Sequence, residues 1–243
     1  MAAFVAMTFA EFSAYYKNPE MLAVLDAMPR ELLEAFGMAN ANLTTVSGYL
    51  GVSMVFINVT LAVYATMLGH NLVAKEERDK TAGFLLTLPV TRTRVLAGKI
   101  VAGVLCSLLL LAVVALSMLA ATIPYEVEPD FPRFFTLLML TTFLIMLIFL
   151  CLGVFLAAAT RKHKLSAGLG MGVVFALYIA SVLSGLTEQM EFLRYLSPFE
   201  YFEAAALLSD LRIEPLFAGI TAAAIAASLA GAYHFYNQRD MYV

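Results

Sequence analysis

Long apolar stretches separated by short polar segments dominate the hydrophobic pattern of this chain. Five of these stretches contain about 20 or more mainly apolar residues, which is long enough to cross a bilayer as a helix. Helices are expected because a helix satisfies its own backbone hydrogen bonds where no water is present. The pattern predicts an all-α polytopic membrane bundle with spans at residues 46–72, 95–123, 134–160, 165–186 and 215–236.

The first 16 residues form a shorter apolar stretch, which Glu11 interrupts. This stretch falls short of the ~20 residues that a span needs. It also lacks the basic region and small-residue cleavage site of a secretory signal. We therefore expect a truncated or partially embedded first helix, with a start site further upstream as the alternative.

Composition supports the membrane assignment, because 62% of the residues are hydrophobic and 14% are charged. A soluble domain has about 45–50% apolar and about 25% charged residues. The net charge of −3 gives no basic surface for nucleic acid. Cys106 and Cys151 both lie inside apolar stretches, where cysteine behaves as a small hydrophobe. A disulfide or metal role for this pair is not expected.

The basic residues predict how the spans are oriented. The loop between the first two long spans, the loop at residues 161–164 and the C-terminus are expected on one side of the membrane. Ten of the 15 Lys and Arg residues lie on that side. These ten are Lys75, Arg78, Lys80, Arg92, Arg94, Lys99, Arg161, Lys162, Lys164 and Arg239. Cytoplasmic loops are enriched in Lys and Arg, so this side and the C-terminus are predicted to be cytoplasmic.

Two segments on the opposite side have helical patterns. Residues 21–37 are predicted to form a short amphipathic helix, with Pro29 near its start and Gly37 at its end. Residues 188–212 are predicted to form an external helical element. In this element Ser197 and Glu200 match a capping box, which predicts a helix running through Ala204 toward Ser209.

Within the spans, Gly168 and Gly172 share one helix face, which predicts close packing against another helix of the same chain, with a dimer seam as the alternative. The other polar groups are small, and Asn58, Ser107 and Thr142 are examples. We expect such side chains to hydrogen-bond to backbone or to neighbouring helices. Ion-coupled carriers usually need buried charges, so a path lined this way suits lipid-like or amphipathic cargo better than small ions.

Catalytic and metal-binding motifs are missing from the sequence. It contains no Gly-x-x-x-x-Gly-Lys-Ser/Thr phosphate loop, and Gly98-Lys99 is followed by Ile100. The three histidines are far apart, and His70 and His234 are expected at the membrane interface rather than in a joint metal site. The chain is therefore predicted not to be an enzyme and to bind no cofactor itself.

Residues 73–94, which we call the 73–94 segment, are more ordered than a membrane loop requires. The segment opens with a mixed-charge cluster, continues with an apolar patch and closes with proline and arginines. This layout fits a short helix offered to a partner, with charges facing the partner and apolar side chains filling a groove. The residues expected to contact the partner are Glu76, Glu77, Thr81, Phe84, Leu85, Leu86, Pro89 and Arg92.

The same segment resembles the one that follows the second span in permease subunits of ABC-2 type exporters. That pattern has two acids, a Gly-Thr pair, a Leu-Leu pair, Pro-Val-Ser/Thr-Arg, and Gly-Lys shortly afterwards. The positions in register are Glu76, Glu77, Thr81, Leu85, Leu86, Pro89, Val90, Thr91, Arg92, Gly98 and Lys99. Lys80 replaces the usual glycine, and Gly83 stands where an acid is common.

The resemblance implies one transmembrane permease domain over residues 1–243, in the cytoplasmic membrane and with the family's usual six spans reduced to five and a short helix. It implies export of a hydrophobic or amphipathic compound. The implied partners are a cytoplasmic ATPase subunit that carries ATP and magnesium, and a second permease subunit of the same or another kind. The alternatives are a non-transporting sensor or assembly protein that docks a cytoplasmic partner, and an ion-coupled secondary transporter. A membrane-embedded enzyme would need a reactive group of side chains, which the sequence lacks.

Overall fold

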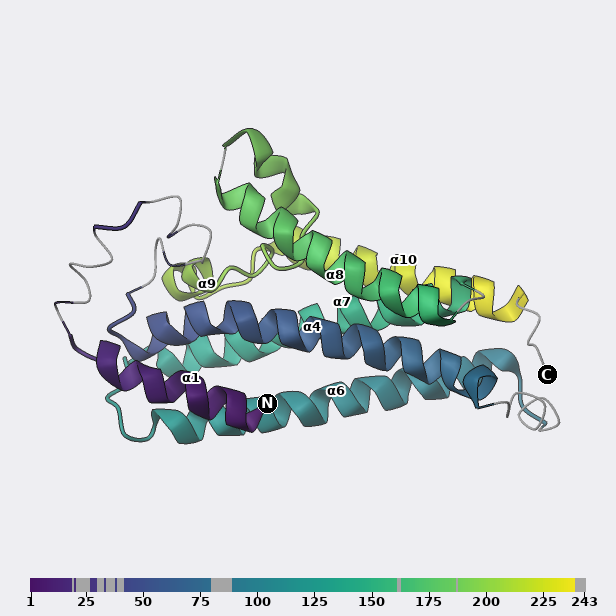
Figure 1. Cartoon of the computed structure of the whole chain (residues 1–243), viewed down its shortest axis with the longest axis horizontal. Coiled ribbons are helices and arrows are strands. Elements are labelled where there is room, and N and C mark those ends of the chain that lie inside the picture. Colours follow the sequence, from purple (N-terminus) through teal and green to yellow (C-terminus); the bar gives the residue numbers. More distant parts are fainter. Residues whose placement is uncertain are drawn as a thin grey trace. The chain divides into compact units, whose positions relative to one another are not determined.

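The computed structural model describes residues 1–18, 20, 27–29, 33, 38, 42–79, 89–160, 163–186 and 188–238 (Figure 1). These residues contain seven α-helices and one 3₁₀ helix, and no strand. The α-helices are α1 (Ala2–Tyr15), α4 (Val46–Arg78), α6 (Arg92–Thr122), α7 (Phe131–Ala159), α8 (His163–Leu186), α9 (Ala204–Asp210) and α10 (Pro215–Gln238), and the 3₁₀ helix is η1 (Glu188–Tyr195). The predicted all-α fold class is confirmed.

Five of these helices, α4, α6, α7, α8 and α10, are long and apolar enough to cross a membrane. Their spanning portions are 30, 31, 29, 21 and 24 residues long, against the ~20 residues that a span needs. Helix α1 has 14 residues and remains a short apolar helix. The prediction of five spans and a short N-terminal helix is therefore confirmed.

The helix ends differ from the hydropathy boundaries where polar residues continue a helix. Helix α4 extends to Arg78, six residues past the predicted end of the first long span. Hydropathy marks where the chain leaves the apolar layer, whereas the helix continues into water as long as its backbone bonds do. The predicted amphipathic helix at residues 21–37 falls mostly outside the described residues.

Contacts divide the chain into two compact units, and each long helix contributes a part to both. The first unit contains Met1–Val59, Leu109–Phe143 and Leu177–Ala218. The second contains Thr60–Leu108, Leu144–Ala176 and Gly219–Val243. The two units are described separately below.

An aromatic cluster attaches α1 to α4 in the first unit. Phe12 is fully buried, and its ring lies 4.6 Å from that of Tyr49 and 4.8 Å from that of Tyr125. The Tyr49 hydroxyl donates to the carbonyl oxygen of Thr8 at 2.6 Å. Aromatic pairs of this kind contribute about 0.5–1.5 kcal/mol each beyond their buried area, so the short helix is anchored by packing rather than by its length.

Small polar side chains inside the spans are satisfied locally, as the sequence predicts. The Thr142 hydroxyl of α7 donates to Asn58 Oδ1 of α4 at 3.1 Å, within the first unit. In the second unit the Thr66 hydroxyl donates to the carbonyl of Ala62 at 2.8 Å. Ser107 and Thr221 are exceptions, because their buried hydroxyls have no hydrogen-bond partner among the described residues.

Two glycines bring α4 and α7 close together in the second unit. A Cβ atom on Gly153 of α7 would lie 2.2 Å from the carbonyl oxygen of Thr66 in α4. A Cβ atom on Gly69 of α4 would lie 2.3 Å from the carbonyl oxygen of Leu150 in α7. The two helices run parallel and therefore touch backbone to backbone at two neighbouring points, which we call the glycine seam.

The predicted close packing of Gly168 and Gly172 against another helix of the same chain is wrong, whereas the dimer seam stays a prediction. A Cβ atom at either position would have no atom within 4 Å among the described parts of the chain. The close contact on α8 is made by Gly170, where a Cβ atom would lie 2.8 Å from Thr66 Cγ2. Spacing shows which glycines share a face, but it does not show which face meets a neighbouring helix.

Candidate functional site

The helices that flank the 73–94 segment end in well-defined ways. Helix α4 closes with a hydrogen bond from the Asp79 amide to the carbonyl of Lys75 at 2.8 Å. Helix α6 opens at Thr91, whose carbonyl accepts from the Val95 amide at 3.1 Å. The Thr91 hydroxyl oxygen also accepts from the Arg94 amide at 3.3 Å, in the manner of a helix N-cap. Thr91 therefore sets where α6 begins.

The structure gives partial positions for the predicted partner-contacting residues. Glu76 and Glu77 lie in the last turn of α4, and Pro89 is exposed just before the α6 cap. Arg92 is the first residue of α6. The other predicted contacts, Thr81, Phe84, Leu85 and Leu86, fall outside the described residues. The N-cap role of Thr91 was missed from the sequence, although a threonine directly before a helical apolar pattern is a helix-start signal.

The two acids stand at the unfavourable end of their helix. A helix C-terminus carries a partial negative charge, and a carboxylate there is disfavoured by about 0.3–1 kcal/mol where it is exposed. Glu76 and Glu77 follow Lys75 in the last turn. The charge of the helix end therefore gives no stabilisation of α4 by acids at these positions.

A hydrophobic cluster in the second unit connects both ends of the 73–94 segment to other spans. The buried members are Val73 of α4, Leu96 of α6, Val154, Ala157 and Ala158 of α7, and Ala232 and Tyr236 of α10. The Thr93 hydroxyl of α6 also lies 3.4 Å from Asn237 Oδ1 of α10, within hydrogen-bond distance. A force on the segment would therefore be transmitted to four helices through close-packed side chains, which resist compression.

His70 is buried inside the protein, and its predicted place at the membrane interface stays a prediction. Its side chain is 6% exposed, and its Nδ1 atom lies 3.1 Å from the Ser166 hydroxyl of α8, within the second unit. Among the described residues no group of three or more His, Cys, Asp or Glu side chains could hold a metal ion. The contact between His70 and Ser166 joins α4 to α8.

The segment after η1 is fastened to α8 in a way that the capping-box prediction missed. The buried Ser197 hydroxyl donates to the carbonyl of Leu177 at 2.8 Å. Glu200 accepts a hydrogen bond from the Ser181 hydroxyl at 2.6 Å. Helix α9 then begins at Ala204, after an N-cap residue, Glu203, whose side chain makes no cap bond. The predicted helix start at Ser197 is wrong: residues 198–202 form turns, although the Ser197 hydroxyl oxygen also accepts from the Phe199 amide at 3.4 Å.

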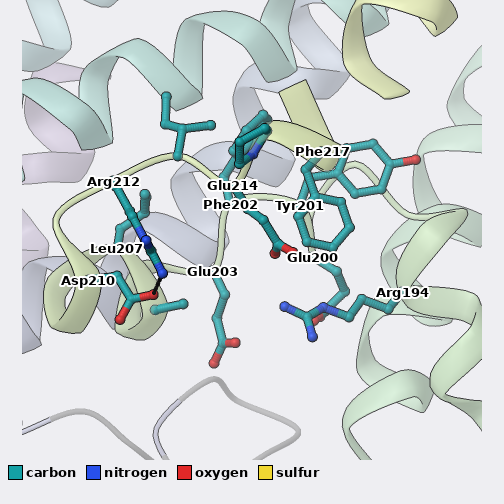
Figure 2. A pocket seen from close by; sticks show the side chains of 13 residues that line it. Arg194, Glu200, Tyr201, Phe202, Glu203, Leu207, Asp210, Arg212, Glu214 and Phe217 are labelled. Carbon is teal, nitrogen blue, oxygen red and sulfur yellow. Dashed lines mark ion pairs between the residues drawn. The ribbon is translucent and has the colours of Figure 1, made fainter. Parts of the chain in front are cut away.

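A charged cavity of about 360 Å³ lies beside this segment, within the first unit (Figure 2). Its wall includes Arg194 of η1, the turn before α9, α9 itself and the start of α10. Figure 2 shows Arg212 and Asp210 on one side and Arg194 near Glu200 on the other, with Glu203 between them. We call this space the outer-segment cavity.

Local contacts set the electrostatics of the outer-segment cavity. Burial raises the pKa of Glu200, and the hydrogen bond from Ser181 and the nearby Arg194 guanidinium oppose that rise. The Arg194 guanidinium lies 5.1 Å from the centre of the Phe217 ring, a cation–π contact. Arg212 pairs with Asp210 at 3.6 Å, and both side chains are more than half exposed. Exposed pairs contribute about 0–1 kcal/mol to stability, so the main effect of this pair is to hold the two charged groups close to each other.

A sequence model of the family described as ABC-2 family transporter protein matches residues 1–241. The chain belongs to this family of transporters. No curated protein matches it closely enough to add a relative. The family match confirms the resemblance that the 73–94 segment suggested, and it extends over nearly the whole chain.

As an ABC-2 transporter protein, the chain is a multi-pass membrane permease. ABC-2 permeases of this kind lack an ATPase domain, and a partner subunit typically hydrolyses ATP. The two features that the structure makes concrete are the tethered ends of the 73–94 segment and the outer-segment cavity.

Proposed function

We propose that this chain is the permease subunit of an ATP-driven ABC-2 exporter, and that it moves a hydrophobic or amphipathic substrate outward across the cytoplasmic membrane. The family match over residues 1–241 is the observation that carries the proposal. The missing phosphate-binding loop supports assigning ATP and magnesium to a separate cytoplasmic ATPase subunit. A second permease subunit, identical or different, completes the proposed complex.

The composition of the spans supports the proposed class of cargo. Residues 46–74, 100–122, 134–159, 165–186 and 215–238 contain no Asp, Glu, Lys or Arg. Transporters that move small ions or protons usually place such residues along the path. An uncharged bundle needs an external energy source, which ATP hydrolysis by a partner would provide.

The 73–94 segment is the proposed docking site for the ATPase. Acids at the end of α4 can meet basic residues of a partner, while Leu85 and Leu86 can fill a groove, as amphipathic helices do in other complexes. The hydrophobic cluster that connects Val73 and Leu96 to α7 and α10 supports a mechanical role for the segment. Movement of the docked ATPase would then reach the spans through the packed side chains of Val73 and Leu96.

The deciding experiment is purification of the complex from native membranes, followed by reconstitution. We expect an ATP-binding subunit to co-purify with this chain. Proteoliposomes holding both subunits should show ATP-dependent flux of a lipophilic fluorescent compound, and proteoliposomes holding this chain alone should not. Flux that follows an ion gradient without ATP would instead favour the secondary transporter.

The proposed orientation can be tested with single cysteines in a background without Cys106 and Cys151. We expect cysteines at Lys80 and Lys162 to react with a membrane-impermeant maleimide only after the inner membrane is permeabilised. Cysteines at the exposed positions Asp130 and Ser209 should react in intact cells whose outer barriers admit the reagent. The physical reason is the excess of Lys and Arg on the predicted cytoplasmic side. The opposite labelling pattern would reverse the orientation.

A further inference from the structure

A groove of about 280 Å³ lies between α1 and α4, within the first unit, and we call it the α1–α4 groove. On α1 its wall includes Phe4, Thr8, Glu11 and Tyr15. These residues follow one another at steps of four, three and four positions, which places them on one helix face. The facing wall is the side of α4 that carries Val52 and Phe56.

The apolar part of the α1–α4 groove is accessible to a ligand. Within the chain Phe4 is 41% exposed, Met7 is 67% exposed and Phe56 is 43% exposed, and all three line the groove. The buried side of α1, with Phe9 and Phe12, packs against the protein instead. An apolar groove on the outside of a membrane helix meets hydrocarbon, so the molecules available to fill it are lipids.

Polarity changes along the α1–α4 groove in the same order as along a lipid. The Lys17 amide donates to the Thr44 carbonyl at 3.2 Å, so the end of α1 meets the start of α4. Glu11 and Tyr15 therefore lie near this junction, while Phe4 and Phe56 lie further from it. From Phe4 to Tyr15 a helix rises about 16 Å, which is about half of the ~30 Å hydrocarbon core. The groove thus has the length of one leaflet, with its polar groups at one end.

Glu11 gives the polar end of the groove a negative charge. It is the only acid of α1, its side chain is exposed, and among the described residues it forms no hydrogen bond or salt bridge. The nearest basic residue in the sequence is Lys17, whose ammonium is paired with Glu126. Tyr15 lies one helical turn beyond Glu11, and tyrosine is enriched at the headgroup level. A carboxylate at this depth attracts a cationic headgroup and repels an anionic lipid.

We propose that the α1–α4 groove holds a membrane phospholipid with a primary ammonium headgroup. One acyl chain lies against Phe4, Met7 and Phe56, and the ammonium group lies at Glu11. The inference goes beyond the proposed function, since this lipid is retained without ATP and without an ATPase subunit. Its test therefore succeeds or fails independently of the transport assignment.

The test is native mass spectrometry of the purified full chain in detergent that contains equal amounts of two lipids. The lipids are phosphatidylethanolamine and phosphatidylglycerol with identical acyl chains, so they differ only in the headgroup. We expect the parent to retain phosphatidylethanolamine several-fold more than phosphatidylglycerol. Glu11→Gln should abolish this preference. The matched control Asp130→Asn, an exposed acid that does not line the groove, should keep it.

A variant with the opposite effect separates loss of the site from loss of folding. Glu11→Lys places a cation at the polar end of the groove and should reverse the preference toward phosphatidylglycerol, which a misfolded protein would not do. Glycerophosphoethanolamine, which has the headgroup but no acyl chain, should not displace the bound lipid from the parent. Equal retention of the two lipids by the parent, an unchanged preference in Glu11→Gln, or displacement by the free headgroup would overturn the proposal.

Discussion

A Gly153→Ala variant is expected to lose most of its folded, membrane-inserted protein, although alanine is the better helix former. The added Cβ atom would lie 2.2 Å from the Thr66 carbonyl oxygen, and that oxygen belongs to the backbone of α4. A backbone atom cannot rotate away as a side chain can, so α4 and α7 must separate. Overpacking of this kind costs about 1–3 kcal/mol and occasionally more. We expect a clear drop in the thermal unfolding temperature in detergent and in the amount of monodisperse protein.

The chain offers a matched control for this substitution. Gly172→Ala makes the same chemical change on α8, at a position where a Cβ atom has nothing within 4 Å. Alanine is favoured over glycine inside a helix by about 0.5–1 kcal/mol, so this variant should be as stable as the parent or slightly more stable. If both variants lose the same stability, then the spans tolerate no glycine-to-alanine substitution, and the glycine seam does not explain the loss.

A double variant tests whether the two glycines act as one contact. A Cβ atom on Gly69 would lie 2.3 Å from the Leu150 carbonyl oxygen, next to the contact made by Gly153. Once Gly153→Ala has moved the helices apart, Gly69→Ala should add little further destabilisation. Residues in one contact commonly show coupling energies of about 0.5–3 kcal/mol. Strict additivity of the two substitutions would place the glycines in independent environments.

The span pattern was predictable because bilayer thickness fixes how long an apolar helix must be. The sequence placed all five spans, and the observed ends differ by a few residues where charged or capped turns extend a helix. Helix α4 continues through Lys75 and Arg78, and α6 starts early because Thr91 caps it. Those extensions depend on local hydrogen bonds rather than on hydrophobicity.

The packing partners were not predictable from spacing alone. Gly168 and Gly172 repeat the small-xxx-small pattern and yet meet no other atom of the described chain, whereas Gly69 and Gly153 form the seam. A signal for the seam was present in the sequence. Ala65 lies four residues before Gly69, Ala157 lies four residues after Gly153, and both alanines are buried. The sequence does not say which of several such faces will meet, because that choice depends on every neighbouring helix.

The candidate sites divide in the same way. The 73–94 segment was recognised from its order of charges, apolar residues and proline, which is a local property of the sequence. The outer-segment cavity was not recognised, because it assembles residues from η1, α9 and α10 with the turns between them. Ser197 and Glu200 read as a local cap, but in the structure they hold this segment to α8. The roles of Ser197 and Glu200 depend on partners in α8, and the spacing of residues in the sequence does not predict such partners.

Charge reversal in the 73–94 segment should separate docking from folding with unusual clarity. Glu77 lies in the last turn of α4, where the helix dipole disfavours a carboxylate and favours a cation. Glu77→Lys should therefore leave α4 at least as stable as before. Against a basic partner surface the same change brings like charges together, which costs several kcal/mol where they lie close. We expect ATPase association in a pull-down to fall by at least tenfold, with normal abundance of the permease.

A substitution in the apolar part of the segment should weaken ATPase binding for a different physical reason. Leu85→Ala removes a proposed groove-filling side chain, and a hot spot of that kind contributes about 2 kcal/mol or more. That loss corresponds to roughly a 30-fold weaker complex, because about 1.4 kcal/mol is a factor of ten. High salt should weaken the interaction of the Glu77 side chain with the partner and leave the contribution of Leu85 nearly unchanged. Salt titration of the pull-down therefore distinguishes the two contacts.

Matched controls for both changes exist elsewhere in the chain. Asp130→Lys reverses an exposed charge on the predicted outer side, and Leu116→Ala shortens a side chain on α6 that is 68% exposed within the chain. Both controls should bind the ATPase and support flux as the parent does.

Pro89→Ala should reduce flux more than binding, because Pro89 precedes the Thr91 cap and sets how the segment enters α6. If Glu77→Lys and Leu85→Ala also bind and transport like the parent, the 73–94 segment is only a linker, and the ATPase must dock elsewhere on the permease.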